Sequence, residues 1–386
     1  MIFDLYQLMA SSKIAQFCLG MSAAFVAASL VPAASRGQPT VGPAARSAAA
    51  PAQKHVEQAK VAIRATPINP ADLLDAARRG QTTILNRLIA AGASVAARDD
   101  DGNSALSLAA MAGRLDTVRA LLSTQVDVNA SNHAGDTSLI LALRGGHADI
   151  AVNLIERGAD IAARNKRGDT ALSLAIHHCH EQMIRRLVDH GADVRGATDT
   201  GTTALMAAAP ACSLNLLEFL ISKGAPVDAR NNLGQTALWI SANHGNTGGL
   251  VALLKHNADR HIADNEGRTP LLAALEYGQH DAAQLLLGDP SDTDRSTNVG
   301  NTPLMLATRS GMADIVRLLL KNGARTDLRN KFGYTALMIG CQEGHADIVA
   351  TLLKAGADRN LRNKKRETAM DIAAASGHGT LESLFK

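Results

Sequence analysis

The sequence predicts an all-α protein in which about ten helix-turn-helix units, joined by hairpin loops, stack into one solenoid. Three observations predict it: a turn glycine that returns every 33 residues, two short apolar helical patterns within each period, and an aromatic content of only 3% in 386 residues. A fixed period of this length is typical of stacked repeats, whose small residues let neighbouring helices lie close together. The turn glycines, which we use to name the units, are Gly102, Gly135, Gly168, Gly201, Gly234, Gly267, Gly300 and Gly333.

The Gly300 unit shows how each element follows from its residues. The glycine suits a turn because it adopts positive φ at little cost. Thr302 is placed to cap a first helix, and Pro303 stands at the first helical position, where a missing N–H costs nothing. Gly311 ends that helix. The second helix carries Ile315-Val316 and Leu319-Leu320, a spacing that makes one apolar stripe.

The two end units depart from this pattern, as end units do when one face has no neighbour. In the first unit Asn69-Pro70 stand where the turn and helix start are expected, and Gly80 falls in register. In the last unit Arg366 replaces the turn glycine, and the chain ends inside the second helix at Lys386. With these two, we count ten units.

Period, capping residue, turn glycines and helix stripe together resemble the ankyrin repeat, over residues 67–386. The resemblance implies a turn, two antiparallel helices and a projecting hairpin per unit, and a binding function rather than catalysis. The family's Thr-Pro-Leu-His signature loses its His in every copy, so we expect apolar packing to replace the hydrogen bonds with which that His ties neighbouring repeats. The residues at its place are Ser107, Ile140, Ser173, Met206, Trp239, Leu272, Met305, Met338 and Asp371.

The N-terminal region predicts export. A largely apolar run from Ile14 to Val31 is followed by small residues and then Arg36, which is typical of a signal peptide over residues 1–34. Cleavage would leave the repeats periplasmic or secreted, whereas an uncleaved segment would anchor exported repeats in the inner membrane, the only membrane contact that we expect. Whether Met1 or Met9 is the true start stays open. Residues 35–66 are rich in Ala and Pro and predict a flexible linker.

Charge and motifs argue against several functions. Six of the 39 Lys and Arg residues and two of the 36 acidic residues fall in residues 1–66, which leaves 33 basic and 34 acidic residues in the repeats. A nearly neutral solenoid argues against nucleic-acid binding, which needs a basic stripe. No catalytic constellation or cofactor-binding loop is present, and no small-molecule substrate is evident. We therefore expect no enzyme activity and no cofactor.

A cluster at His177-His178-Cys179-His180, with Cys212 one period later, suggests an alternative metal- or redox-responsive function. Adjacent residues on a helix cannot all face one ion, so we expect no metal site. We also expect no disulfide, because stacked helices lie about 8–10 Å apart and a bridge needs Cα atoms within about 7 Å. Cys341 replaces a small helix residue and is expected to be buried.

The resemblance places partner contacts on the concave face, at the hairpin tips and the exposed ends of the first helices. Large side chains at these positions are candidate anchors for a protein partner of unknown identity. For Phe332 and Tyr334 the alternative is packing on neighbouring hairpins. A further alternative is an effector that acts in another cell. The candidate partner-binding residues are Leu233, Tyr277, Arg309, Lys331, Phe332, Tyr334 and Gln342, and Arg144 and Glu276 occupy further first-helix ends.

Overall fold

The computed structural model describes residues 69–288 and 290–386, which fall within one compact unit of the chain. The predictions for the signal peptide or anchor, the linker, the start residue and the resulting location lie outside the described residues.

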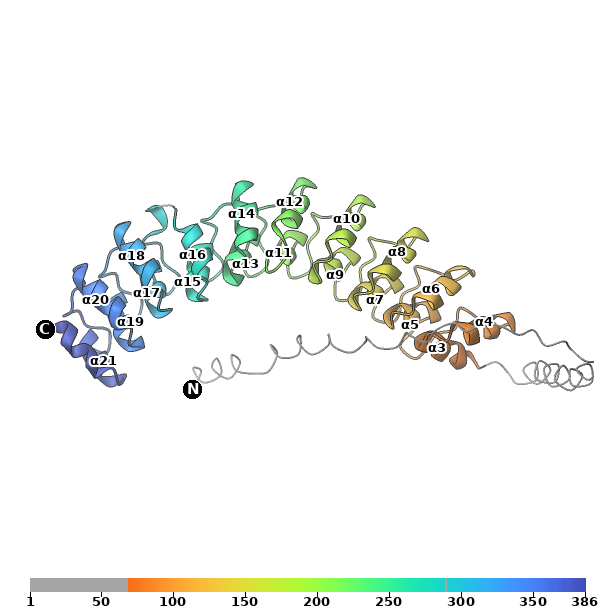
Figure 1. The fold of residues 1–386 in the computed structure, drawn as a ribbon, viewed down its shortest axis with the longest axis horizontal. Coiled ribbons are helices and arrows are strands. Elements are labelled where there is room, and N and C mark those ends of the chain that lie inside the picture. The colour runs from red at the N-terminus through yellow and green to blue at the C-terminus, as the bar shows by residue number, and fades with distance from the viewer. Residues whose placement is uncertain (1–68, 289) are drawn as a thin grey trace, which may run out of the picture. The chain divides into compact units, whose positions relative to one another are not determined.

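The described helices pair into ten units, as predicted (Figure 1). The first helices of the units are α3 (Pro70–Arg79), α5 (Ala105–Met111), α7 (Ser138–Arg144), α9 (Ala171–His177), α11 (Ala204–Ala208), α13 (Ala237–His244), α15 (Pro270–Glu276), α17 (Pro303–Arg309), α19 (Ala336–Glu343) and α21 (Ala369–Ala375). The second helices are α4 (Thr82–Ala90), α6 (Leu115–Leu122), α8 (Ala148–Glu156), α10 (Glu181–Asp189), α12 (Leu214–Ser222), α14 (Thr247–Lys255), α16 (His280–Leu286), α18 (Ala313–Lys321), α20 (Ala346–Lys354) and the 3-10 helix η3 (Gly379–Phe385). A short 3-10 helix, η2 (Pro290–Asp292), precedes α17.

The predicted caps start the first helices. In the Gly300 unit the Thr302 hydroxyl accepts a hydrogen bond of 3.3 Å from the Met305 N–H. The Ser or Thr two residues after each turn does the same in all nine units that carry one. Arg366, which replaces the last turn glycine, takes the same left-handed conformation with φ 66°. The repeat pattern therefore specifies where each helix begins.

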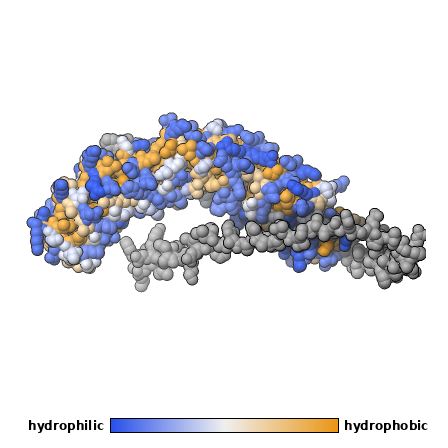
Figure 2. Space-filling model, viewed as in Figure 1, coloured by the Kyte–Doolittle hydropathy of each residue, from blue (hydrophilic) through white to orange (hydrophobic). Residues whose placement is uncertain are grey.

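Neighbouring first helices pack on one another along the row, and each packs on its own second helix. Figure 1 shows the first helices along the inner side of a curved row of helix pairs, with the second helices outside. On the face seen in Figure 2, apolar residues gather along the row and hydrophilic residues border them. The first helices therefore line the inner side of the row (Figure 1).

Apolar packing takes the place of the signature histidine, as expected. Six of its replacements are buried with at most 3% of their surface exposed, and the serine of the Gly102 unit is buried too. The six are Ile140, Met206, Trp239, Leu272, Met305 and Met338. Only Ser173 and Asp371 are less covered by neighbouring units.

The expectation of no disulfide was wrong: Cys179 and Cys212 are bridged, with their Cα atoms 5.5 Å apart. The helix spacing did not apply because both cysteines lie in loops. Cys179 follows α9 with φ 48°, in the left-handed region, and α11 ends early, at Ala208, with Pro210 between it and Cys212. The two loops can therefore approach more closely than the helix axes do.

Cys341 is buried, as predicted, and its thiol is free. Burial raises the pKa of this thiol to about 12. In the part of the chain that the structure describes, no helix has the length and apolar character needed to cross a membrane.

Candidate partner-binding surface

A side chain three residues before the turn glycine shapes each hairpin. In the Gly333 unit the Asn330 Oδ1 accepts hydrogen bonds from the N–H groups of Phe332 and Tyr334, at 2.9 and 3.0 Å. Asn231 holds Leu233 in the same way, at 3.0 Å. A short amide or carboxylate suits this place because it mimics a backbone acceptor within a tight turn. The hairpin is thereby held without help from the residue at its tip.

Neighbouring hairpins are also joined through their backbones. The Phe332 carbonyl accepts a hydrogen bond of 3.1 Å from the Lys364 N–H, and the Leu233 carbonyl accepts one of 3.0 Å from the Asn265 N–H. The N–H and the carbonyl of each of these residues are both engaged, which holds the backbone in place, and the side chains are exposed. We call the residues at this position the tip row: Asp101, Ala134, Arg167, Thr200, Leu233, Glu266, Val299, Phe332 and Lys365.

Large apolar side chains of the tip row are exposed. Leu233 is 62% exposed, Phe332 60% and Val299 42%. Burying an exposed side chain of this size gains about 1.5–3 kcal/mol, so apolar groups held out in a row are a feature that a partner can use. Tyr334 differs: it is half-buried and packs against the core. The structure thus separates two residues that the sequence analysis treated together.

The remaining candidate residues line the first-helix ends and the adjoining tips. Arg309 is the last residue of α17, and Gln342, at the equivalent position of its own unit, is the last but one of α19. Both residues are exposed. Tyr277 caps α15 and is 50% exposed. Lys331 is exposed beside Phe332. These residues are therefore spread over the first-helix ends and hairpin tips of several units.

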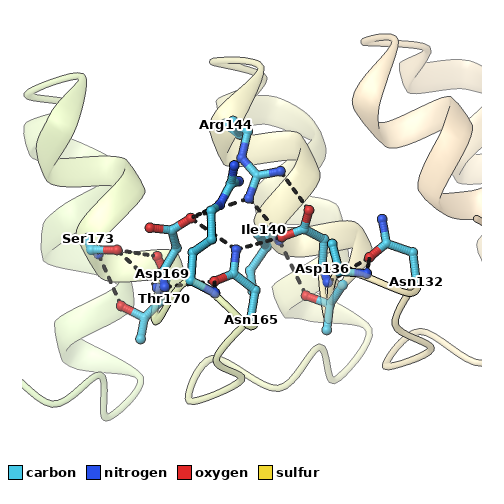
Figure 3. Close-up of polar contacts among 11 residues, drawn as sticks. Asn132, Asp136, Ile140, Arg144, Asn165, Asp169, Thr170 and Ser173 are labelled. Atoms are coloured by element: carbon cyan, nitrogen blue, oxygen red, sulfur yellow. Dashed lines mark hydrogen bonds and ion pairs between the residues drawn. The ribbon is translucent and has the colours of Figure 1, made fainter. Parts of the chain in front are cut away.

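Arg144, another first-helix end, is engaged inside the protein. Its guanidinium donates two hydrogen bonds of 2.7 Å to the carboxylate of Asp136, and it lies 3.4 Å from that of Asp169 (Figure 3). Asn165 of the next hairpin donates to the same Asp136 carboxylate at 2.7 Å. Burial by itself raises the pKa of Asp136, but Arg144 and Asn165 outweigh it and the pKa lies below its usual value. Arg144 therefore ties two units together.

A second internal arginine supports the surface around Tyr277. Arg268 pairs with Asp264 at 2.8 Å and with Glu276 at 3.3 Å, and its guanidinium lies 5.3 Å from the ring centroid of Trp239. Burial lowers the pKa of Arg268, but the carboxylates of Asp264, Glu276 and Glu266 outweigh it and raise that pKa. Arg268 thus fixes the end of α15, next to Tyr277.

The histidine cluster does not assemble into a chelating group. His177 and His178 meet edge to face, with ring centroids 5.3 Å apart, and the Cys179 sulfur is used in the disulfide. Among the described residues, no three His, Cys, Asp or Glu side chains are grouped so as to hold a metal ion.

A comparison with protein families agrees with this architecture. The family model described as ankyrin repeats (3 copies) matches residues 73–165, 154–231, 210–297, 238–330, 288–363 and 304–386. The chain belongs to the ankyrin repeat family. Members of this family are generally non-catalytic interaction modules.

No curated protein matches this ankyrin chain. Among solved structures, it is similar to a chain in the complex of a predatory endopeptidase from Bdellovibrio bacteriovorus with an immunity protein. The two chains are 31% identical, the match covers 48% of this chain and 97% of that one, and the TM-score is 0.45.

Sequence reasoning missed the polar residues that tie the ankyrin hairpins together. A signal was present, because Asn recurs at the 33-residue spacing at positions 132, 165, 231, 330 and 363. Asn132 reaches back to the Asn103 side chain at 2.9 Å, and Asn330 reaches back to that of Asn301 at 2.9 Å. A polar ladder therefore acts beside the apolar packing.

Proposed function

We propose that this ankyrin chain is a non-catalytic scaffold that binds a protein partner along the inner side of its row of units. The contact surface comprises the tip row from Leu233 to Phe332 and the neighbouring first-helix ends with Tyr277, Arg309 and Gln342. The observation that carries the proposal is the exposure of Leu233, Val299 and Phe332 on hairpins that are held by hydrogen bonds. The N–H and the carbonyl of Leu233 and Phe332 are both engaged, as is the Val299 carbonyl. Large anchors that are fixed before binding lose little conformational entropy when a partner covers them.

The charge around Phe332 indicates what the partner offers. Lys331, Lys364, Lys365 and Arg366 are exposed, and none of them forms an ion pair with another described residue. Opposite charge across an interface raises the association rate and disfavours wrong partners. The partner segment therefore carries acidic residues beside apolar ones.

The proposal includes export of the repeats, by cleavage of the N-terminal segment or with that segment as an anchor. The Cys179–Cys212 bridge supports it, because disulfides persist in oxidising compartments and are rare in the cytosol. Mass spectrometry of the mature N-terminus tests this part, since peptides that begin before residue 33 would contradict cleavage.

Affinity capture of the tagged full chain from its own cells, after cross-linking, tests the scaffold function. The variant is Leu233→Ser/Phe332→Ser, which changes two exposed side chains and leaves the hairpin hydrogen bonds in place. The matched control is Val251→Ser, an equally simple change of a 43% exposed residue on α14, a second helix.

We expect one protein to be enriched with the wild type and the control, and to be lost with the double variant. Recovery of that protein with all three chains would place its contacts elsewhere. Recovery of no specific protein under cross-linking would contradict the scaffold function.

The disulfide also favours a second candidate function, in which the protein responds to redox conditions through Cys179 and Cys212. A dithiol reductant would convert Cys179 and Cys212 to two thiols and would itself become a disulfide. Partner binding that is lost on reduction and restored by reoxidation would indicate this function. Binding that is equal in both states would oppose it.

A further inference from the structure

One junction in the stack lacks the backbone bond that joins the others. At seven of the eight junctions between described hairpins, a tip-row carbonyl accepts an N–H from the next hairpin. The donors are His133, Lys166, Asn232, Asn265, Asn298, Lys331 and Lys364. The equivalent pair, the Arg167 carbonyl and the Asp199 N–H, forms no such bond. The junction between the Gly168 and Gly201 units therefore lacks one of the hairpin bonds that the others have, although the Arg164 guanidinium still donates to the Ala197 carbonyl at 2.7 Å.

Thr198 makes a second difference at this junction, in the side-chain contacts. Position 198 carries Thr where most hairpins carry Asn or Asp. The Thr198 hydroxyl accepts the Thr202 N–H at 3.1 Å and lies 2.8 Å from the Thr200 hydroxyl, so its contacts stay within its own hairpin. Its counterpart Asn165 reaches the preceding unit, at Asp136. The shorter side chain thus removes a tie between units.

A cavity of about 370 Å³ lies at this junction. Its aliphatic lining comes from Ile161, Leu172, Ala204 and Ala207. Ala204 begins α11 and is partly exposed, whereas Ala171 and Ala237, at the same position of the neighbouring units, are each 1% exposed. The cavity is thus surface that neighbouring units cover elsewhere, and its size falls in the range of small ligand sites.

The disulfide lies at the opposite ends of the same helices. The cavity is lined by the starts of α9 and α11, and the Cys179–Cys212 bridge joins the loops that follow their ends, with Cα atoms 5.5 Å apart. The bridge fixes the spacing of the two units at one end, and at the other end the Arg164 guanidinium, bound to the Ala197 carbonyl and to Asp199, joins them in place of the backbone bond. The bridge therefore constrains the two helices that contribute to the cavity lining.

The polar lining offers hydrogen-bond donors rather than charge. The Thr170 hydroxyl oxygen accepts the Ser173 N–H at 3.2 Å, and that of Thr203 accepts the Met206 N–H at 3.3 Å. Each hydroxyl hydrogen remains free to donate, since neither has an acceptor among the described residues. The charged Arg164 and Asp193 stand exposed at the rim, and Arg164 is already bound to Asp199 and to the Ala197 carbonyl. An occupant that fits is aliphatic and neutral, and carries an acceptor oxygen.

We propose that this cavity binds an aliphatic residue of the protein partner, with the side chain against Leu172 and Ala207 and a backbone carbonyl accepting from Thr170 or Thr203. The inference rests on the proposed scaffold function and adds a specificity site to it. That site lies one unit before Leu233, the first large apolar side chain of the tip row.

The test uses N-acetyl-L-leucine N-methylamide, which presents an aliphatic side chain and peptide carbonyls without charge. It is titrated into the oxidised full chain with methyl NMR of Leu172 and Ile161 as the readout. We expect saturable shifts with a dissociation constant on the order of 1–10 mM, as suits a ligand of this size. N-acetylglycine N-methylamide is the matched control ligand and should cause no saturable shift.

Ser173→Met is the blocking variant, because Ser173 lines the cavity and Met occupies the same position in the Gly201, Gly300 and Gly333 units. Ser173→Ala is its control, since it removes the same hydroxyl without filling the space. We expect binding at least tenfold weaker in the first and unchanged in the second. Cys179→Gly/Cys212→Ala should also weaken binding by threefold or more.

Leucine binding that Ser173→Met leaves unchanged, or shifts that the glycine ligand reproduces, would overturn the site. Undiminished binding without the bridge would overturn the role given to the disulfide. Because this assay contains no partner, its result does not depend on that of the affinity capture. Failure of the cavity proposal can therefore be told apart from failure of the scaffold proposal.

Discussion

Arg144 donates one hydrogen bond from each terminal guanidinium N–H group to the two carboxylate oxygens of Asp136, each at 2.7 Å (Figure 3). The pair joins the end of α7 to the hairpin of its own unit, and Asn165 extends it to the next hairpin at 2.7 Å. Bidentate pairs of this kind are strong and specific in direction. Asp136 therefore holds together two elements of one unit and the unit that follows.

The first prediction follows from the burial of this carboxylate, whose side chain is 5% exposed. Asp136→Ala leaves Arg144 and Asn165 without their acceptor, and we expect the free energy of unfolding to fall by about 3 kcal/mol. Urea unfolding followed by circular dichroism measures it. Asp100→Ala, which removes an exposed hairpin carboxylate, should cost less than about 0.5 kcal/mol. Equal losses in the two variants would contradict the role of Asp136.

The second prediction concerns pH. The pKa of Asp136 is lower in the folded state than in the unfolded chain, where it is about 3.9. A carboxyl group whose pKa is lower in the folded state stabilises the fold at pH values above its pKa in the unfolded chain. That stabilisation is lost as the pH falls through its pKa in the folded state. The stability gap between wild type and Asp136→Asn should therefore be full at pH 5–7 and shrink below about pH 4. Urea unfolding at each pH measures the gap, and a constant gap would be inconsistent with the lowered pKa.

The unit architecture could be predicted because each element follows from short-range chemistry. Thr302 caps a helix, and Gly300, two residues before it, takes the positive φ of the turn. Residues of the same kind return every 33 positions. Local propensity, helix stripe and turn chemistry agree, which is the condition under which a sequence specifies its fold clearly.

The ties between units could not be read in the same way. Arg144 and Asp136 are eight residues apart, and their meeting depends on the direction of a long side chain across the unit. The Cys179–Cys212 bridge depends on the path of two loops after Pro210 has ended α11, and helix spacing says nothing about that path. For the candidate surface, sequence position identified Leu233 and Phe332, but only the structure separates Phe332 from Tyr334.

The third prediction concerns Arg268, which pairs with Asp264, a side chain only 1% exposed. Arg268→Met keeps the aliphatic stem but leaves the carboxylate buried without its cation, so we expect a loss of about 3 kcal/mol. Asp264→Asn in the same background should restore part of it. Trp239 is the only tryptophan and lies against Arg268, so its fluorescence reports this site directly. An unchanged emission maximum and midpoint would argue against the pairing.

The fourth prediction concerns Cys341. With its pKa raised to about 12, only about one molecule in ten thousand carries the thiolate at pH 8, and the thiol is buried. The Cys18→Ser background removes the fourth cysteine of the sequence, which lies outside the described residues. In this background a thiol-specific chromogenic reagent should therefore label no cysteine in the native, oxidised protein. It should label one after unfolding in urea and three after unfolding with reduction. Rapid labelling of the native protein would contradict the burial.

The last prediction concerns the stability that the bridge provides. The Cys179–Cys212 disulfide closes a loop with a sequence separation of 33, and the chain-entropy relation for a loop of that size gives about 3–4 kcal/mol. The reference variant is Cys179→Gly/Cys212→Ala, because Gly stands at the position of Cys179 in most other units and Ala is a small residue that suits the buried site of Cys212. We expect its urea midpoint to lie below that of the oxidised wild type and close to that of the reduced wild type. Cys341→Ser controls for the loss of a thiol and should show the same dependence on reductant as the wild type. If reduction moved the midpoint of the bridge-free variant as far as that of the wild type, the stabilisation would come from somewhere other than this bridge.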